Sequence, residues 1–212
     1  MRLYTRWQNS AGERVRIALN LKGLAYDYVP VSSLSREAYL AANPQGLMPA
    51  LEVDGQVIAQ SAAILAFLEE MHPDPPLLPA NPLTRAAVRA FAAHIAAEMH
   101  AITVSRVRVF LREDLALGED GVRRWVAHWH GLGLIALEAA LAGRAVDWPF
   151  CYGETPGWAD LHLVPQLAAS RRNGVDVSPY RRLLLVEANC VGLDAFRRAR
   201  PEAQPDFPGD QG

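Results

Sequence analysis

The sequence predicts a small α/β domain followed by an all-helical domain. Two short apolar runs, LYT at residues 3–5 and YDYVPV at residues 26–31, read as strands on either side of a helix, which makes a β-α-β unit. Further along, ALEV and VIA flank Asp54-Gly55, a dipeptide that favours a two-residue hairpin. Because strands and helices alternate in this part of the chain, we expect one layered α/β domain.

The helices of this first part carry local start and stop signals. The first has apolar residues three and four positions apart from Val15 onward and ends at Gly23, a residue suited to a helix C-terminus. A short helix is expected at residues 36–42. The last helix, SAAILAFLEEM, is expected to take Ser61 as its N-cap and to stop before Pro73.

A proline-rich stretch at residues 73–82 cannot continue a helix or a central strand and is predicted to be a linker. Beyond it the periodicity is helical only. The expected helices are Thr84 to about Leu117, Asp120 to about Leu141, Gly157 to about Arg172, and the segments RRLLLVEANC and GLDAFRRAR. The polar tail PEAQPDFPGDQG is expected to lie loosely on the surface. The expected domains are therefore 1–80 and 84–206.

Composition excludes several functions. The chain has 212 residues, 50% hydrophobic content and a net charge of −2, so it has no broad basic face for nucleic acid or for an anionic membrane. Cys151 and Cys190 have no metal-ligand spacing and are too few for a secreted disulfide framework; both are expected to be reduced and buried. Neither a signal peptide nor a membrane span is recognisable, so a cytoplasmic location is expected.

The segment NSAGER, residues 9–14, raises a question about its small residues. Ser10 and Glu13 have the spacing of a capping box, which would by itself explain the start of the helix. The alternative is that the small side chains leave room for a ligand at the helix N-terminus. Both interpretations remain open from the residues alone.

A set of motifs in order along the chain resembles the zeta class of glutathione transferases. They are RVRIALNLKG, NPQGLMPALEVDG, QSAAILAFLEEMHP, LLP, WADLHLVPQ, VDVSPY and QPD. The resemblance implies the glutathione transferase fold, with an N-terminal thioredoxin-like domain that binds glutathione and an all-helical domain that binds the substrate. It also implies a homodimer that isomerises a maleyl keto acid, a dicarboxylate, from cis to trans in aromatic-compound catabolism, with the glutathione thiolate as nucleophile.

The resemblance assigns glutathione contacts in the first domain. Pro49 is expected to follow a cis peptide bond, and the Met48 backbone to pair with the cysteinyl part of glutathione. Gln60 and Ser61 are expected near the γ-glutamyl carboxylate at a helix N-terminus, although Ser61 also reads as a simple cap. Arg14 is the last residue of NSAGER, the segment that is matched to the start of the family's first helix, and it is also expected to contact glutathione.

The family's thiolate-supporting serine is absent, because Asn9 takes its place. We expect Asn9 and Ser10 to share this catalytic role, the first through its amide and the second through its hydroxyl. Glu13 is expected to oppose them, since a carboxylate disfavours a second anion nearby. Gln8 stands where the family has an arginine that contacts the substrate.

Three residues of the helical domain complete the expected site. His100 falls where the family has a polar glutathione contact, and Arg172 and Arg106 fall where it has arginines for substrate carboxylates. The plain alternative is that the arginines form a solvated helix face. The spacings of His128 and His130, and of His94 and Glu98, do not make a metal site. A broad-specificity transferase or peroxidase, and a non-catalytic binding protein, remain the alternative functions.

Overall fold

The computed structural model describes residues 1–209, which form two compact units. The first unit is Met1–Leu77 together with the segment from Val191 onward, and the second is Leu78–Cys190. These units are defined by contacts and differ from the expected domains 1–80 and 84–206, because the last helical segment packs with the first unit. The division by function remains a prediction.

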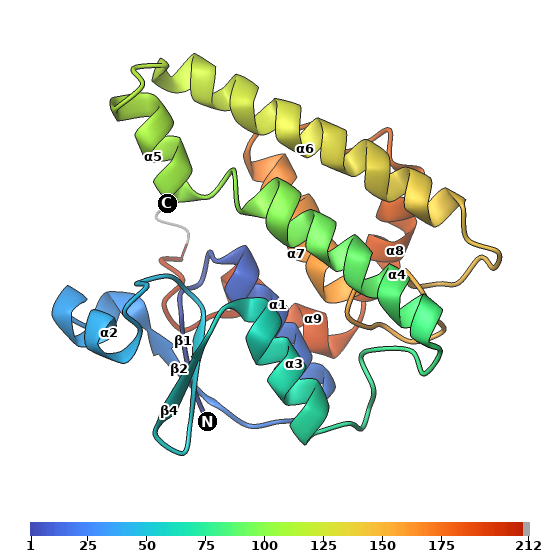
Figure 1. Cartoon of the computed structure of the whole chain (residues 1–212), viewed down its shortest axis with the longest axis horizontal. Coiled ribbons are helices and arrows are strands. Elements are labelled where there is room, and N and C mark those ends of the chain that lie inside the picture. The colour runs from blue at the N-terminus through green and yellow to red at the C-terminus, as the bar shows by residue number, and fades with distance from the viewer. Residues whose placement is uncertain (210–212) are drawn as a thin grey trace. The chain divides into compact units, whose positions relative to one another are not determined.

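A four-stranded mixed sheet forms the centre of the first unit (Figure 1). Its strands are β1 (Arg2–Thr5), β2 (Asp27–Pro30), β3 (Ala50–Val53) and β4 (Gln56–Ala59), in the order β2-β1-β3-β4. Strands β1 and β2 are parallel, whereas β1 with β3 and β3 with β4 are antiparallel. Asp54 and Gly55 have φ values of 51° and 77°, as a primed two-residue hairpin turn requires. The predicted β-α-β unit and hairpin are therefore confirmed.

Helices cover both faces of this sheet. They are α1 (Ser10–Leu21), α2 (Arg36–Ala42), α3 (Ser61–Met71) and α9 (Asp194–Arg197), with short 3-10 turns η1 (Val31–Ser33) and η3 (Pro201–Ala203). Helices α1 and α3 pack together on one side and α2 lies on the other (Figure 1). Gly23 has a φ of 64° and the Leu24 N–H donates to Leu19 O over 2.9 Å, which confirms the predicted end of α1.

The second unit consists of helices. They are α4 (Pro82–Ala93), the π-helix η2 (His94–His100), α5 (Ser105–Glu113), α6 (Gly118–Ala142), α7 (Asp160–Arg172) and α8 (Arg181–Val191). The expectation of one continuous helix from Thr84 to Leu117 is wrong. The Thr103 hydroxyl donates to Met99 O over 2.7 Å and so competes for a carbonyl that would otherwise continue the helix. The Met99 side chain also fills the space in which a side chain at Gly133 of α6 would lie.

His130 belongs to a buried polar network inside the second unit. Its Nε2 lies 3.1 Å from the Thr103 hydroxyl and its Nδ1 lies 3.0 Å from the Ser170 hydroxyl. Burial, with a smaller effect from Arg108, lowers the pKa of His130 to about 4, so the ring is neutral and joins α6 to its neighbours. Within residues 1–209 no three potential metal ligands form a group.

The two cysteines are free and buried, as expected. Burial raises the pKa of both thiols, and thiols kept protonated are poor nucleophiles. The Asp160 carboxylate accepts the backbone N–H groups of Cys151 and Gly157, each over 2.8 Å. This carboxylate therefore anchors the start of α7.

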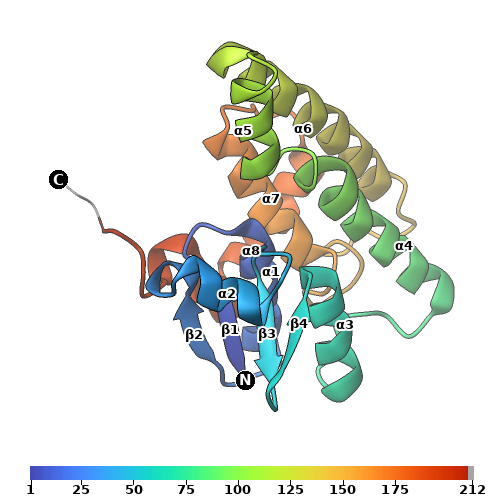
Figure 2. The ribbon, with the colours of Figure 1, turned by 60° about the vertical axis from the view of Figure 1, so that its left-hand side comes forward.

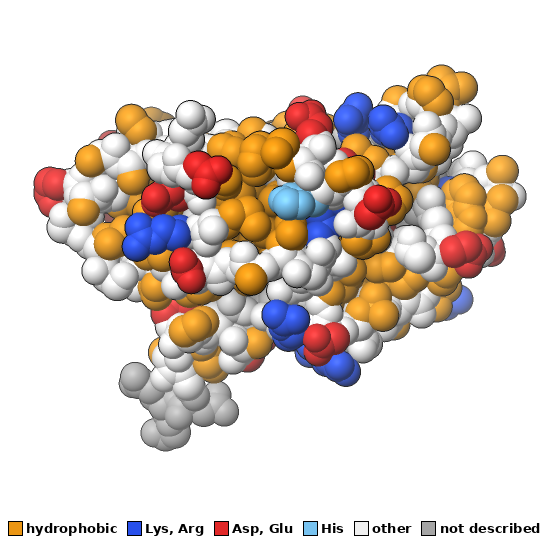
Figure 3. All heavy atoms as spheres, turned by 90° about the horizontal axis from the view of Figure 1, so that it is seen from below, with side chains coloured by type: hydrophobic (Ala, Val, Ile, Leu, Met, Phe, Trp, Pro, Cys, Tyr) orange, Lys and Arg blue, Asp and Glu red, His pale blue; other side chains and the backbone are white. Residues whose placement is uncertain are grey.

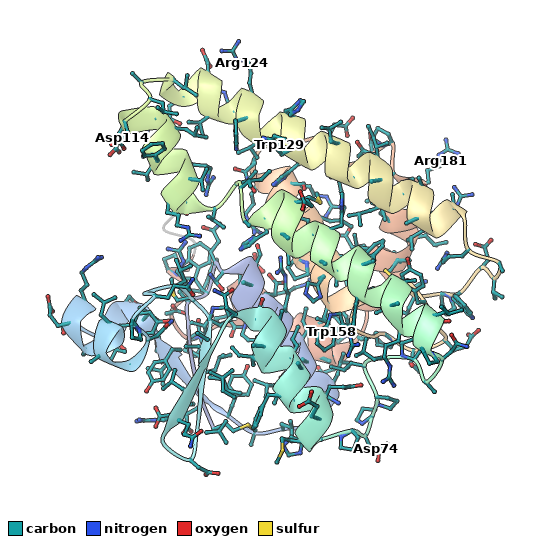
Figure 4. All side chains as sticks on the ribbon, viewed as in Figure 1. Asp74, Asp114, Arg124, Trp129, Trp158 and Arg181 are labelled. Atoms are coloured by element: carbon teal, nitrogen blue, oxygen red, sulfur yellow. The ribbon has the colours of Figure 1, made fainter. Side chains whose placement is uncertain are left out.

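The surface carries charges of both signs. On the face drawn in Figure 3, acidic and basic side chains are interspersed. Arg124 on α6 and Arg181 on α8 point away from the other helices (Figure 4), as solvated arginines do. Within the described part of the chain, no helix has the length and apolar character needed to cross a membrane.

The expectation of a loose C-terminal tail is wrong for residues 201–207. Pro201 and Gln204 are buried, and the Asp206 carboxylate accepts hydrogen bonds from Trp7 and Tyr28. Tertiary contacts thus hold a segment whose composition alone predicts none. Residues 210–212, the end of the tail, lie outside the described residues.

Candidate active site

Three chain segments meet at one end of the sheet in the first unit. Tyr4 pairs with Ala50, and Ala50 pairs with Ala59. Because β1 is antiparallel to β3 and β3 is antiparallel to β4, the end of β1, the start of β3 and the end of β4 lie at the same end of the sheet. This end is called the sheet edge below. The segments that continue from them carry seven of the predicted site residues: Gln8, Asn9, Ser10, Met48, Pro49, Gln60 and Ser61.

Asn9 is the N-cap of α1. It has extended backbone angles, φ −143° and ψ 102°, and its side-chain oxygen accepts the Gly12 N–H. Ser10 is already the first helical residue, so the expected capping box between Ser10 and Glu13 is wrong. Asparagine is among the best N-cap residues. Its amide oxygen makes the capping bond here, and Nδ2, a hydrogen-bond donor, is the other polar atom of the same amide.

The position of Gly12 has no room for a side chain, because two other side chains lie against it. A Cβ at Gly12 would collide with the Thr5 hydroxyl and lie 2.7 Å from the Asn9 side-chain oxygen. Thr5 is fully buried and cannot move aside easily. The sequence left open that the small residues make room for a ligand. At Gly12 the missing side chain instead makes room for the Asn9 side chain that caps the helix.

Replacing Gly12 with alanine is expected to lower the free energy of unfolding by about 1–3 kcal/mol, the usual cost of overpacking. Gly131→Ala on α6 is the matched control, because nothing lies within 4 Å of a Cβ added there and alanine favours a helix. Thermal melts followed by circular dichroism measure both. Equal melting temperatures for the two variants would contradict the packing role of Gly12.

The start of α3 has an unusual backbone. Ser61 is its first helical residue, and Gln60 occupies the N-cap position with φ 72° and no capping side-chain bond, so the expectation of Ser61 as the N-cap is wrong. A positive φ is rare for a residue such as Gln and often marks a functional site. The Gln60 amide donates to Gln45 Oε1 over 2.6 Å. Nothing in the local sequence pattern singles out Gln45, which lies in the NPQG segment.

Two helices, α1 and α3, begin at this edge, and Ser10 and Ser61 are both buried there. The first N–H groups of a helix have no partner within it and carry a partial positive charge. Together the two helix N-termini make this edge favourable for anions, of which a carboxylate and a thiolate are examples. The peptide bond between Met48 and Pro49, at the same edge, is cis, as the resemblance implies.

Arg14 is buried in α1 with unused hydrogen-bonding capacity. Burial lowers its pKa to about 10, while the charge of Glu13 acts in the opposite direction. Among the described residues, neither Nε nor Nη2 of Arg14 has a hydrogen-bond partner. The Glu13 charge also acts on Arg16, so this carboxylate interacts with two buried cations. That Glu13 opposes a bound anion stays a prediction.

The remaining predicted residues belong to the second unit. His100 ends the π-helix η2, while Arg106 in the first turn of α5 and Arg172 at the end of α7 are exposed. Arg108 Nη1 donates to Asn173 Oδ1 over 2.9 Å, so the start of α5 lies beside the end of α7. Arg171 differs from its neighbour, because its guanidinium binds Glu187 through two bonds of 2.6 and 2.5 Å.

Comparison with known proteins shows the family to which the first unit and the whole chain belong. Residues 8–76 match the family model for the N-terminal domain of glutathione S-transferase. A maleylpyruvate isomerase from Ralstonia is 43% identical over 97% of this chain and 99% of its own length.

Two solved structures extend the comparison. The holo structure of a bacterial zeta-class maleylpyruvate isomerase has a TM-score of 0.94 and 43% identity, and covers 97% of this chain and 99% of its own. A maleylacetoacetate isomerase from Anaeromyxobacter dehalogenans, solved with dicarboxyethyl glutathione and citrate in the active site, has a TM-score of 0.87 and 41% identity, covering 99% and 94%. This chain belongs to the zeta-class isomerase family of the glutathione S-transferases.

Proposed function

We propose that this protein catalyses the glutathione-dependent cis–trans isomerisation of a maleyl keto acid, maleylacetoacetate or maleylpyruvate, in the breakdown of aromatic compounds. The observation that carries the proposal is the convergence of residues 8–10, 48–49 and 60–61 at one sheet edge with two helix N-termini. That the relatives named above are such isomerases supports it.

The donors at this edge fit glutathione, which is a peptide with two carboxylates and a thiol. We assign the Met48 backbone, beside Pro49, to the cysteinyl part of glutathione. Gln60, Ser61 and the N-terminus of α3 suit the γ-glutamyl carboxylate. The unused guanidinium donors of Arg14 suit an anionic group of the same ligand. His100 is proposed as a further polar contact.

When bound, glutathione would supply the thiol nucleophile for the reaction. The role of the chain is to hold that thiol deprotonated. The Nδ2 of Asn9 and the hydroxyl of Ser10 are proposed to donate hydrogen bonds to the sulfur, and the α1 N-terminus favours its negative charge. Arg172, Arg106 and Gln8 are proposed to bind and orient the substrate carboxylates, for which arginine is well shaped.

Asn9→Asp is expected to raise the pKa of the bound glutathione thiol by about one to two units, because it removes a donor worth about 1.5–3 kcal/mol to a charged acceptor. The aspartate also places a negative charge beside the sulfur, which acts in the same direction. The helix cap is preserved, since a carboxylate oxygen can accept the Gly12 N–H as the amide oxygen does. Thiolate absorbance as a function of pH measures the shift.

Two further variants separate the effect of helix capping from the effect on the thiol pKa. Asn9→Ser preserves a cap and supplies a hydroxyl donor, so its thiol pKa is expected near that of the wild type. Ser10→Ala leaves the Asn9 cap intact and is expected to raise the thiol pKa without lowering stability. If Asn9→Asp and Ser10→Ala both leave the thiol pKa unchanged, neither side chain supports the thiolate.

Two assays distinguish the candidate functions. Glutathione affinity measured by calorimetry tests the binding site, and the loss of absorbance of maleylacetoacetate or maleylpyruvate tests isomerisation. Binding with isomerisation supports the proposal. Binding with conjugation or peroxide reduction alone would favour a broad transferase or peroxidase, and no binding would favour a non-catalytic protein with this fold. A homodimer in the cytoplasm is the assembly and location that we propose.

A further inference from the structure

The C-terminal segment returns to the first unit and contacts the loop that precedes α1. This segment, residues 199–207, is called the C-terminal strap below. Ala199, Pro201 and Gln204 are buried, and Gln204 Nε2 donates to the carbonyls of Arg198 and Arg200 over 2.8 Å each. Figure 2 shows the strap beside β2, at the edge of the sheet. The strap is therefore packed and internally bonded up to the point where it meets the loop.

Asp206 joins this strap to two other elements. One carboxylate oxygen accepts the backbone N–H of Trp7 over 3.1 Å, and the other accepts the Tyr28 hydroxyl of β2 over 2.6 Å. The next residue, Phe207, packs edge-on against the Trp7 ring with 5.2 Å between ring centroids. One turn of the strap thus holds both the backbone and the side chain of Trp7.

Arg16 fixes the same loop from the side of α1. Its guanidinium is fully buried; Nε donates to Ala199 O of the strap over 3.0 Å, and Nη1 and Nη2 donate to the carbonyls of Arg6 and Trp7 over 3.2 Å each. A buried charge is tolerated when its donors are satisfied in this way. Burial lowers the pKa of Arg16, and the charges of Glu13 and Asp206 act against that shift.

The loop held in this way has only four residues, 6–9, and leads directly into Ser10. The Arg6 side chain donates to Gln8 O over 3.0 Å, so the carbonyls of Arg6, Trp7 and Gln8 and the N–H of Trp7 all have partners. Residues 8–10 follow or belong to this loop, and they are the ones assigned to the thiol and the substrate. The position of Asn9 is therefore set by the contacts of the three residues that precede it.

We propose that Asp206 is a positioning residue for the glutathione thiol: through the Trp7 backbone it holds loop 6–9 in the conformation that presents Asn9 and Ser10. This inference rests on the proposed function. Asp206 itself contacts neither the sulfur nor the substrate in this scheme. The alternative is that the strap only stabilises the fold, in which case its loss lowers the melting temperature and leaves the thiol unchanged.

Three variants test the proposal. Asp206→Ala removes both acceptors. Asp206→Asn can retain both contacts, because its oxygen accepts from Trp7 while its amide donates to the Tyr28 oxygen. Tyr28→Phe removes the bond to β2 and leaves the one to Trp7, so it is the matched control for loss of a strap contact. Should Asp206→Ala fail to fold, Asp206→Ser, whose shorter side chain cannot reach both partners, replaces it.

The first measurement needs no glutathione. Hydrogen exchange of a peptide that covers residues 4–12 is expected to be faster in Asp206→Ala than in the wild type, Asp206→Asn and Tyr28→Phe. The second measurement determines two quantities, the pKa of the bound glutathione thiol and kcat/KM for a maleyl keto acid. Both are measured at a temperature below the melting temperature of the variant. Asp206→Ala is expected to raise the thiol pKa and to lower kcat/KM about ten- to a hundredfold, the size that a misplaced catalytic group can cost. The other two variants should stay close to the wild type in both quantities, because each retains the contact to Trp7.

The possible failures are distinguishable. If the wild type neither binds glutathione nor isomerises the substrate, the proposed function is wrong, whatever the exchange data show. If the wild type is active and Asp206→Ala loses stability but retains the thiol pKa and kcat/KM, the strap is only structural and the inference is wrong. Equal losses in Asp206→Ala and Tyr28→Phe would also overturn it, because the contact to Trp7 would then have no special role.

Discussion

Arg172→Ala is expected to lower kcat/KM for a maleyl dicarboxylate by tens to thousands of fold and to leave glutathione affinity nearly unchanged. Arg172 is exposed at the end of α7, where the family resemblance implies a contact with a substrate carboxylate. When bound substrate covers the pair and excludes water, a carboxylate that loses its charged partner costs about 2–5 kcal/mol, which sets the size of the effect. Steady-state kinetics and glutathione calorimetry on the same variant measure the two quantities.

Arg171→Ala is the matched control for this experiment. It removes the same charge one position away, but the Arg171 guanidinium binds Glu187, so little change in kcat/KM is expected. Arg106→Ala should cost less than Arg172→Ala, because Arg106 belongs to an arginine-rich exposed helix. Arg172→Lys should restore activity only in part, since lysine retains the charge without the planar fork. Full activity in Arg172→Ala, or loss of glutathione binding with it, would refute this assignment.

Lys22→Met is expected to lower the free energy of unfolding by about 3–5 kcal/mol, the usual cost of removing one partner of a buried ion pair. The Lys22 side chain is fully buried, and its Nζ lies 2.8 Å from Glu69 Oε2. It also donates to the carbonyls of His72 and Pro75 over 2.6 and 2.9 Å. The ammonium thus uses its three donors to join α1, α3 and the start of the linker.

Melting temperatures read by circular dichroism measure this effect, with a decrease of about 6–20 °C expected for a chain of this size. Arg197→Met is the control, because its pair with Asp194 is 3.4 Å apart and more than half exposed on both sides, and exposed pairs contribute about 0–1 kcal/mol. Lys22→Arg should also destabilise, since a planar guanidinium cannot reproduce the three contacts of an ammonium. Similar melting temperatures for Lys22→Met and Arg197→Met would show that the buried pair contributes little.

Lys22 also illustrates what a sequence hides. It is the only lysine in the chain, yet nothing in its local pattern indicates burial, because its partners are 47 to 53 residues away. Asp206 is a similar case. Its partners Trp7 and Tyr28 are 199 and 178 residues away, and composition alone predicts a loose tail. Contacts of this kind arise when the chain has folded and cannot be read from a window of neighbouring residues.

Local signals determined the elements of the first unit. The alternation of strands and helices, the Asp54-Gly55 turn and the glycine that ends α1 are short-range features, in which a residue's own conformational preferences decide the outcome. The motif resemblance likewise identified the family, because it depends on residue types in order. Seven predicted site residues then fell at one sheet edge, since the pairing of antiparallel strands brings the corresponding ends together.

Tertiary structure decided the caps, the breaks and the supports of the site. Asn9 rather than Ser10 caps α1, because Gly12 leaves space for its side chain against Thr5. The expected long helix after the linker breaks where the Thr103 hydroxyl binds the Met99 carbonyl and joins the buried His130. In each case two competing local conformations differ by about 1 kcal/mol, the size of one cap or one hydrogen bond. Contacts from residues distant in the sequence are therefore enough to select between them.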